Sequence, residues 1–159
     1  MDSKELRSAY GDSIEVGSAR YAHMSVDEIL DEGCRTPGQM VKEFHHAFNV
    51  PVPEVITDLD EARKKLRMDL LDEEYEEFKE AVEEKDVVEV VSELADLVYV
   101  AYGMALELGV DLDAVITEIH RANMSKLGPD GRPVLRPDGK VLKGDGFRKA
   151  DVASVLGVD

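Results

Sequence analysis

Three stretches with helical periodicity, separated by very short connectors, constrain the fold of this chain more than any other feature. They are expected to be helices over residues 57–85, 86–109 and 111–126. Because such short connectors leave no room for a crossover, successive helices must pack antiparallel. The sequence therefore predicts an all-α fold, an antiparallel helical bundle.

Capping residues support this division. Residues 57–61 hold overlapping capping-box patterns that begin at Thr57 and Asp58, so the first long helix is expected to start there. A shorter helix is expected before it, from residues 36–37, which pair an N-cap threonine with a proline, to the break at residues 49–51. Four helices are therefore expected in the bundle.

The two ends of the chain differ from this helical centre. Residues 1–35 have weak periodicity and are expected to form a partly ordered arm, which leaves residues 36–159 as a single catalytic domain. After the third long helix, Pro-Asp-Gly turn signals at residues 129–131 and 137–139 flank two short segments. A short C-terminal β-hairpin or turn-rich tail is expected there.

The charge and composition exclude several function classes. The chain has 35 acidic and 19 basic residues, a net charge of −16, which repels nucleic-acid polymers. No apolar run approaches the ~20 residues of a membrane helix, and no secretory signal pattern opens the chain. With a single cysteine, Cys34, a reducing cytoplasm is expected.

One segment runs against this acidic character. Residues 121–149 carry eight basic and three acidic side chains, a local charge of +5. A phosphate-rich ligand would explain such a cationic stretch, and a solubilising tail is the alternative. The segment is therefore a candidate binding region for phosphate.

The first long helix carries glutamates on its apolar side. At 100° per residue, Glu74 and Glu77 fall inside the apolar stripe and Glu73 falls on its edge, whereas Glu76 and Glu83 lie on the opposite side. The stripe consists of Leu59, Ala62, Leu66, Leu70, Leu71, Phe78 and Ala81. An ionised glutamate that faces a core is costly unless another charge compensates it.

The second long helix has a narrow polar strip. Glu93 and Asp96 lie three residues apart on one face of it, and the helix is otherwise apolar enough to be buried on most sides. In an antiparallel pair these carboxylates could meet Glu74 and Glu77. Mg²⁺ would relieve their repulsion, because it prefers oxygen ligands and keeps open positions for phosphates.

Other interpretations of the acidic residues remain open. Each pair alone is typical of a solvated helix face in so acidic a chain. A carboxylate-bridged di-iron helical bundle would need two Glu-x-x-His pairs, and the chain has one, Glu43 with His46. A non-enzymatic acidic interaction protein would need neither carboxylates in the apolar stripe nor a basic tail.

The acidic motifs resemble those of a known family. Glu74-x-x-Glu77 followed by Glu93-x-x-Asp96 is similar to the E-x-x-E and E-x-x-D signature of the MazG-like all-α NTP pyrophosphohydrolases, a superfamily with dimeric dUTPases and dCTP pyrophosphatases. Residues 118–126 look like its N-x-x-K segment, and the tail looks like phage and bacterial members. The cytoplasm would then be that of a bacterium, or of the host cell if a phage encodes the chain.

The resemblance implies an enzyme. It implies that Glu74, Glu77, Glu93 and Asp96 hold two or three Mg²⁺ ions, for which Mn²⁺ is expected to substitute. Activated water would attack the α-phosphorus of an NTP or dNTP and yield the monophosphate and pyrophosphate, in dNTP pool control or house-cleaning. Glu73, with Glu74 beside it, is the candidate catalytic base, although the metal can activate water by itself.

Cationic and aromatic residues are candidates for binding the nucleotide. The candidates for phosphate are Asn123, Lys126, Arg121, Lys140, Lys143 and Arg148. His45 and its neighbour Phe44 are expected either to stack on the nucleobase or to form ordinary core. The identity of the base stays open, as does another phosphorylated substrate such as a histidine-biosynthesis intermediate.

The chain carries more apolar surface than its own helices can bury. Residues 87–101 alone include ten aliphatic side chains, alanine counted, distributed almost all round their helix. A homodimer or homotetramer is therefore expected, and the resemblance points the same way.

Overall fold

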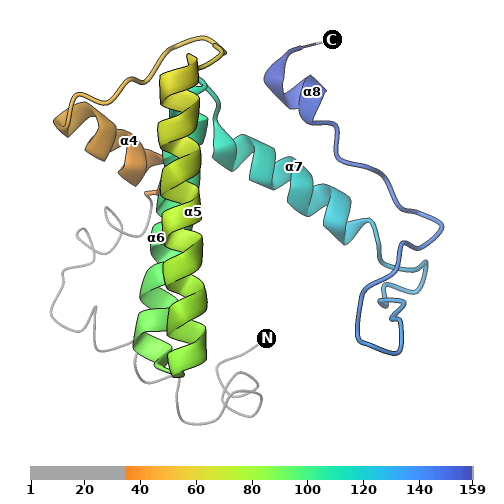
Figure 1. Ribbon diagram of the computed structural model, residues 1–159. Coiled ribbons are helices and arrows are strands. Elements are labelled where there is room, and N and C mark those ends of the chain that lie inside the picture. The colour runs from red at the N-terminus through yellow and green to blue at the C-terminus, as the bar shows by residue number, and fades with distance from the viewer. Residues whose placement is uncertain (1–34, 159) are drawn as a thin grey trace, which may run out of the picture. The chain divides into compact units, whose positions relative to one another are not determined.

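The structure is a computed structural model that describes residues 35–158. Within this range it contains five helices, α4 to α8, and no strand (Figure 1). The all-α fold class predicted from the sequence is confirmed. The partly ordered arm expected over residues 1–35 falls on residues outside the described range, apart from Arg35. No helix in the described range is long and apolar enough to span a membrane.

Helix α4 (Pro37–Ala47) begins where the sequence predicts. Oγ1 of Thr36 accepts a hydrogen bond from the backbone N–H of Gln39 at 3.2 Å, and Oε1 of Gln39 accepts one from the N–H of Thr36 at 2.9 Å. This reciprocal capping box satisfies two N–H groups that would otherwise lack a partner. The helix buries Val41 and His45 and leaves the rest of its surface open.

Helices α5 (Glu61–Glu84) and α6 (Val87–Glu107) run side by side and antiparallel (Figure 1). The two-residue turn between them consists of Lys85, in a left-handed conformation with φ of 62°, and Asp86, whose carboxylate caps α6. This confirms the antiparallel packing expected from the short connector. The α5–α6 pair is the frame on which the other features are placed.

Helix α5 begins later than expected, at Glu61, with Asp60 as its N-cap. Thr57 lies outside the helix, where its backbone N–H donates to the carbonyl of Leu108, at 3.1 Å, at the end of α6. The carboxylate of Asp58 instead accepts from the side chain of Lys64 at 2.9 Å. The connector before α5 is therefore held against the end of α6, a contact that no local pattern encodes.

The C-terminal part consists of α7 (Leu112–Met124), a turn-rich tail and α8 (Val152–Leu156), a short helix that the sequence did not predict. A single isolated antiparallel bridge joins Leu135 to Val141 where a hairpin was considered. The tail returns to α7, because Oγ of Ser125 accepts from the N–H of Arg148 at 2.8 Å. The Glu118 carboxylate likewise accepts from the N–H that begins α8, at 2.7 Å.

One face of α6 has no covering helix in the described part of the chain. Its exposed apolar residues are Val87, Val88, Val91, Leu94 and Val98. The expectation that this helix is buried on most sides is therefore wrong for the single chain, because α4 and α5 cover only part of it. Leaving such a stripe in water costs hydrophobic free energy that association could recover.

Candidate metal and nucleotide site

Three carboxylates converge between α5 and α6. Glu74 and Glu77, one helical turn apart on α5, and Glu93 on α6 each offer an oxygen, and these oxygens lie within 4.8 Å of one another. We call these three residues the acidic cluster. Glu74 and Glu93 are half-buried and Glu77 is exposed, so the cluster is open to solvent on one side. Because it offers oxygen ligands alone, it suits a hard cation such as Mg²⁺ better than a metal that requires histidine.

The charges around the acidic cluster are all negative. Burial raises the pKa of Glu74, and the negative charges of Asp96, Glu77, Glu93 and Glu73 raise it further. Burial likewise raises the pKa of Glu93, assisted by Glu77 and Asp96. Every charge that acts on these two groups is negative, so their repulsion is uncompensated within the described residues. A bound cation would remove that penalty.

Asp96 and Glu73 lie beside the acidic cluster rather than in it. Asp96, the fourth carboxylate of the predicted metal site, affects the pKa of both half-buried glutamates through its charge. Glu73, the candidate base, acts on Glu74 in the same way. The positions of both residues are compatible with their predicted roles, Asp96 as a metal ligand and Glu73 as a base.

The predicted phosphate-binding residues lie on α7 and the tail. Nζ of Lys126 donates to Oδ1 of Asn123 at 2.6 Å, and the guanidinium of Arg121 is paired with Glu118. Lys140 and Lys143 are exposed, with the ammonium of Lys143 4.5 Å from the centre of an aromatic ring in the tail. Within the described helices, α7 contacts α4 and α6 but not α5. Helix α7 therefore does not bring its cations to the α5 side of the acidic cluster.

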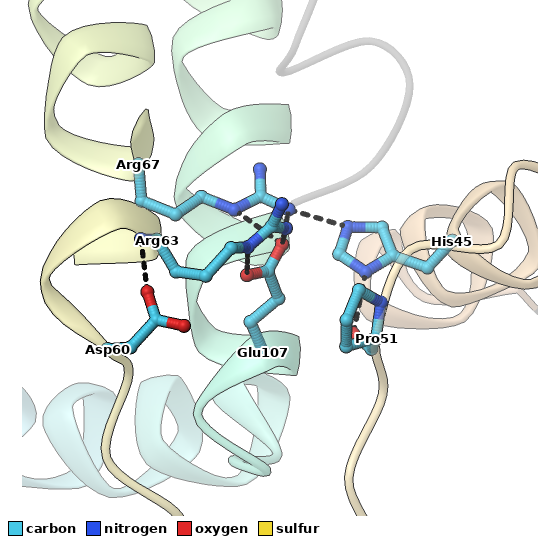
Figure 2. A network of polar contacts seen from close by, with 6 residues as sticks. All are labelled: His45, Pro51, Asp60, Arg63, Arg67 and Glu107. Atoms are coloured by element: carbon cyan, nitrogen blue, oxygen red, sulfur yellow. Dashed lines mark hydrogen bonds and ion pairs between the residues drawn. The ribbon is translucent and has the colours of Figure 1, made fainter. Parts of the chain in front are cut away.

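His45, the predicted base-binding residue, lies in a buried polar network (Figure 2). Its Nε2 meets Nη2 of Arg67 at 3.3 Å, and its Nδ1 meets the carbonyl of Pro51 at 3.4 Å. Nε of Arg67 donates to Glu107 at 2.8 Å, and Nε of Arg63 donates to the other oxygen of that carboxylate at 2.9 Å. We call His45, Arg63, Arg67 and Glu107 the arginine–glutamate network.

The charges of this network compensate one another. Burial raises the pKa of Glu107, but the hydrogen bonds and charges of Arg63 and Arg67 outweigh burial and hold that pKa below its usual value. Burial lowers the pKa of His45 and favours its neutral form. His45 and Glu107 are each only 2% exposed, whereas the side chain of Arg63 is 34% exposed, so the network is open to water on the Arg63 side.

The sequence interpretation overlooked the two arginines and Glu107. The one available signal was the presence of Arg63 and Arg67 one helical turn apart on a helix whose apolar stripe includes Leu66 and Leu70. That spacing identifies a shared face but not a partner. Glu107 lies 40 residues from Arg67 along the chain, so only the packing of α5 on α6 shows the pair.

Part of the chain matches a known protein family and a viral protein. The family model described as phosphoribosyl-ATP pyrophosphohydrolase matches residues 41–123. An uncharacterized protein of Acanthamoeba polyphaga mimivirus is 31% identical over 96 residues, which are 60% of this chain and 36% of that protein. The chain thus spans about a third of the length of this viral relative.

A crystal structure from Exiguobacterium sp. 255-15, provisionally described as an NTP pyrophosphohydrolase, is 25% identical. The similarity covers 77% of this chain and 93% of that one, with a TM-score of 0.39. The family assignment rests on the family match alone, which spans more than half of the chain and includes all four motif carboxylates. The protein therefore belongs to the phosphoribosyl-ATP pyrophosphohydrolase family, among the MazG-like NTP pyrophosphohydrolases that its motifs resemble.

Proposed function

We propose that the protein is a magnesium-dependent nucleoside triphosphate pyrophosphohydrolase that converts an NTP or dNTP and water to the monophosphate and pyrophosphate. The observation that carries this proposal is the acidic cluster, whose carboxylates repel one another and lack a compensating charge. Membership of a pyrophosphohydrolase family supplies the reaction class. A cytoplasmic role in dNTP pool control or house-cleaning would follow.

The residues of the acidic cluster would have distinct tasks. Glu74, Glu77 and Glu93, with Asp96, would hold two or three Mg²⁺ ions, and Mn²⁺ would substitute. When bound, the metal supplies charge stabilisation for the triphosphate and makes water a better nucleophile toward the α-phosphorus. Glu73, close enough to Glu74 to affect its pKa, would accept the proton or orient the group that does.

A second copy of the chain would complete the phosphate site. Arg121, Asn123, Lys126, Lys140 and Lys143 are expected to bind phosphate, yet neither α7 nor α8 contacts α5 within one chain. The uncovered apolar face of α6 lies on the helix that carries Glu93. A homodimer or homotetramer that covered this face could bring the cations of one chain to the acidic cluster of another.

A nucleotide panel tests the proposal directly. The protein would be incubated with each NTP and dNTP in the presence of Mg²⁺ or Mn²⁺, and pyrophosphate would be separated from orthophosphate. We expect monophosphate and pyrophosphate in equal amounts from at least one nucleotide. If none of them yields pyrophosphate, the proposal is wrong.

Phosphoribosyl-ATP is a second candidate substrate, because the matching family model is described by that activity. Its cleavage also releases pyrophosphate from the α-phosphorus of a triphosphate, so the acidic cluster suits both substrates. Adding it to the panel separates them: a kcat/KM above that of every NTP and dNTP would favour this candidate.

A further inference from the structure

A cavity of about 330 Å³ lies between α4, α5 and α6. Its lining includes Phe44 from α4, Leu66, Arg67 and Leu70 from α5, and Tyr99 and Gly103 from α6. The volume is at the lower end of the range of roughly 300–1,000 Å³ that small-molecule sites occupy. It is therefore large enough for one ring system but not for a whole nucleotide with its triphosphate.

The cavity begins one helical turn from the acidic cluster. Leu70 precedes Glu74 by four residues on α5, and Tyr99 follows Asp96 by three residues on α6. Because the two helices are antiparallel, both lead away from the carboxylates in the same direction. A ligand whose phosphates bind at the acidic cluster can thus extend directly into the cavity.

Arg67 and Gly103 lie deeper in the cavity, each seven residues from a carboxylate of the predicted metal site, and Arg63, one further turn along α5, also lines it. At 1.5 Å per residue, this is roughly 10 Å along the helices, a distance that one nucleoside can span. The two positions touch, since a Cβ added to Gly103 would lie 2.9 Å from Nη1 of Arg67. The lack of a side chain at Gly103 leaves room beside this nitrogen.

Nη1 of Arg67 has no hydrogen-bond partner among the described residues, although the residue is only 7% exposed. Its Nε donates to Glu107, and its Nη2 contacts both Glu107 and His45 (Figure 2). Because no buried side-chain nitrogen or oxygen of the described residues lacks a partner, this nitrogen must itself keep some accessible surface. The guanidinium is thus held in place through Nε and Nη2, and a ligand oxygen could accept a hydrogen bond from Nη1.

Aromatic rings form one wall of the cavity. Phe44 and Tyr99 meet edge to face with ring centres 5.8 Å apart, and Phe44 also stacks on Phe48. Phe44 is 40% exposed and Tyr99 37% exposed, so both rings retain free surface. Flat apolar walls beside the donor Nη1 of Arg67 suit a nucleobase better than a sugar.

We propose that this cavity binds the nucleobase and that Nη1 of Arg67 donates to a carbonyl oxygen on the base edge farthest from the sugar. Uracil, thymine, guanine and hypoxanthine carry a carbonyl at that edge, whereas cytosine and adenine carry an amino group, itself a donor. The enzyme therefore selects keto bases over amino bases. This inference rests on the proposed function, because it places the phosphates at the acidic cluster.

Matched substrate pairs test the selection. In the pairs dUTP with dCTP and dITP with dATP, sugar and phosphates are identical, and the main change is carbonyl against amino group. We expect kcat/KM to be at least about tenfold higher for the keto member of each pair. Calorimetric binding of the α,β-imido analogues of dUTP and dCTP, which cannot be cleaved at that bond, should show the same order.

Two variants identify the residues responsible. In Arg67→Lys the charge opposite Glu107 is kept and the planar fork is lost, so the keto preference, measured as the ratio of kcat/KM within each pair, should fall to near unity. Phe44→Leu should raise KM for every nucleotide with kcat nearly unchanged, because it removes the stacking surface. Phe48→Leu is the matched control, since Phe48 does not line the cavity.

The outcomes separate this inference from the proposed function. Pyrophosphate release at equal kcat/KM from both members of each pair would overturn the inference and leave the function standing. Retention of the keto preference in folded Arg67→Lys would also overturn it. If that variant does not fold, Phe44→Leu decides, and a KM unchanged from that of Phe48→Leu would sink the assignment. Release from no nucleotide at all would reject the proposed function itself.

Discussion

The α5–α6 pair carries two groups of charged residues that differ in how their charges are compensated. In the arginine–glutamate network, two guanidinium groups surround one carboxylate, and a neutral histidine takes a further contact. In the acidic cluster, three carboxylates meet with only other carboxylates nearby. The comparison teaches that a buried charge paired within the fold contributes to architecture, whereas one left unpaired marks a place for a ligand.

The largest expected effect is a loss of stability when the arginine–glutamate network is broken. Glu107→Gln would leave the buried Arg67 and the partly exposed Arg63 without their counter-charge, so the free energy of unfolding should fall by about 3–5 kcal/mol, measured by urea denaturation. The control is Asp69→Asn, which removes the exposed partner of Lys65 on the same helix and should cost less than about 0.5 kcal/mol. Equal losses in the two variants would contradict the contrast.

The corresponding change in the acidic cluster should lower activity and should not lower stability. Glu77→Gln removes one carboxylate of the acidic cluster, and kcat should fall by more than the roughly 10–100-fold typical of outer-shell metal partners. The unfolding free energy of the metal-free protein should stay constant or rise, because a repulsion is lost. Glu83→Gln, an exposed change further along α5, should keep full activity. Activity retained in Glu77→Gln would refute the ligand assignment.

Metal binding should sharpen the comparison. Mg²⁺ should stabilise the protein by about 2.7 kcal/mol at a concentration of 100 Kd, measured as a rise in thermal midpoint at constant ionic strength. Glu77→Gln should lose most of this rise, and Glu83→Gln should keep it. An equal rise in both variants would show that the cation acts elsewhere on this acidic surface.

The smallest expected effect is a pH dependence that comes from His45. Burial lowers its folded pKa below the unfolded value of about 6.5. The unfolded chain therefore takes up a proton that the folded protein excludes, and stability complete above about pH 6.5 is lost as the pH falls below it. Urea midpoints between pH 7 and 5 should show this slope in the native protein and a shallower one in His45→Gln. Parallel slopes would contradict it.

Local features of the fold were predictable from the sequence. The capping box at Thr36, the turn between α5 and α6, and the phase of Glu74 and Glu77 depend on neighbours a few residues apart. Helical phase and one short turn indicated that Glu93 could meet them, but its assignment to the site rested more on the family resemblance. The start of α5 was wrong by three to four residues, because a contact from Thr57 to the end of α6 overrides the local capping pattern.

Contacts between residues distant in sequence were not predictable. Arg67 finds Glu107 and His45 only after α4 and α6 are packed on α5, so the arginine–glutamate network left no usable pattern in the chain. For the exposed face of α6, the sequence pattern was clear but did not say what covers that face. Its aliphatic run correctly indicates a surface that avoids water, but a run of apolar residues does not distinguish burial within one chain from burial between two.

The two-residue turn at Lys85 and Asp86 has a consequence for how this chain can change over time. It sets the register of α6 against α5, and that register aligns Glu93 with Glu74 as well as Gly103 with Arg67. One inserted residue would rotate α6 by about 100° and shift it by about 1.5 Å, and would separate both pairs together. A substitution can change the Glu74–Glu93 pair or the Arg67–Gly103 pair alone. A change in the length of this turn would disrupt both pairs at once.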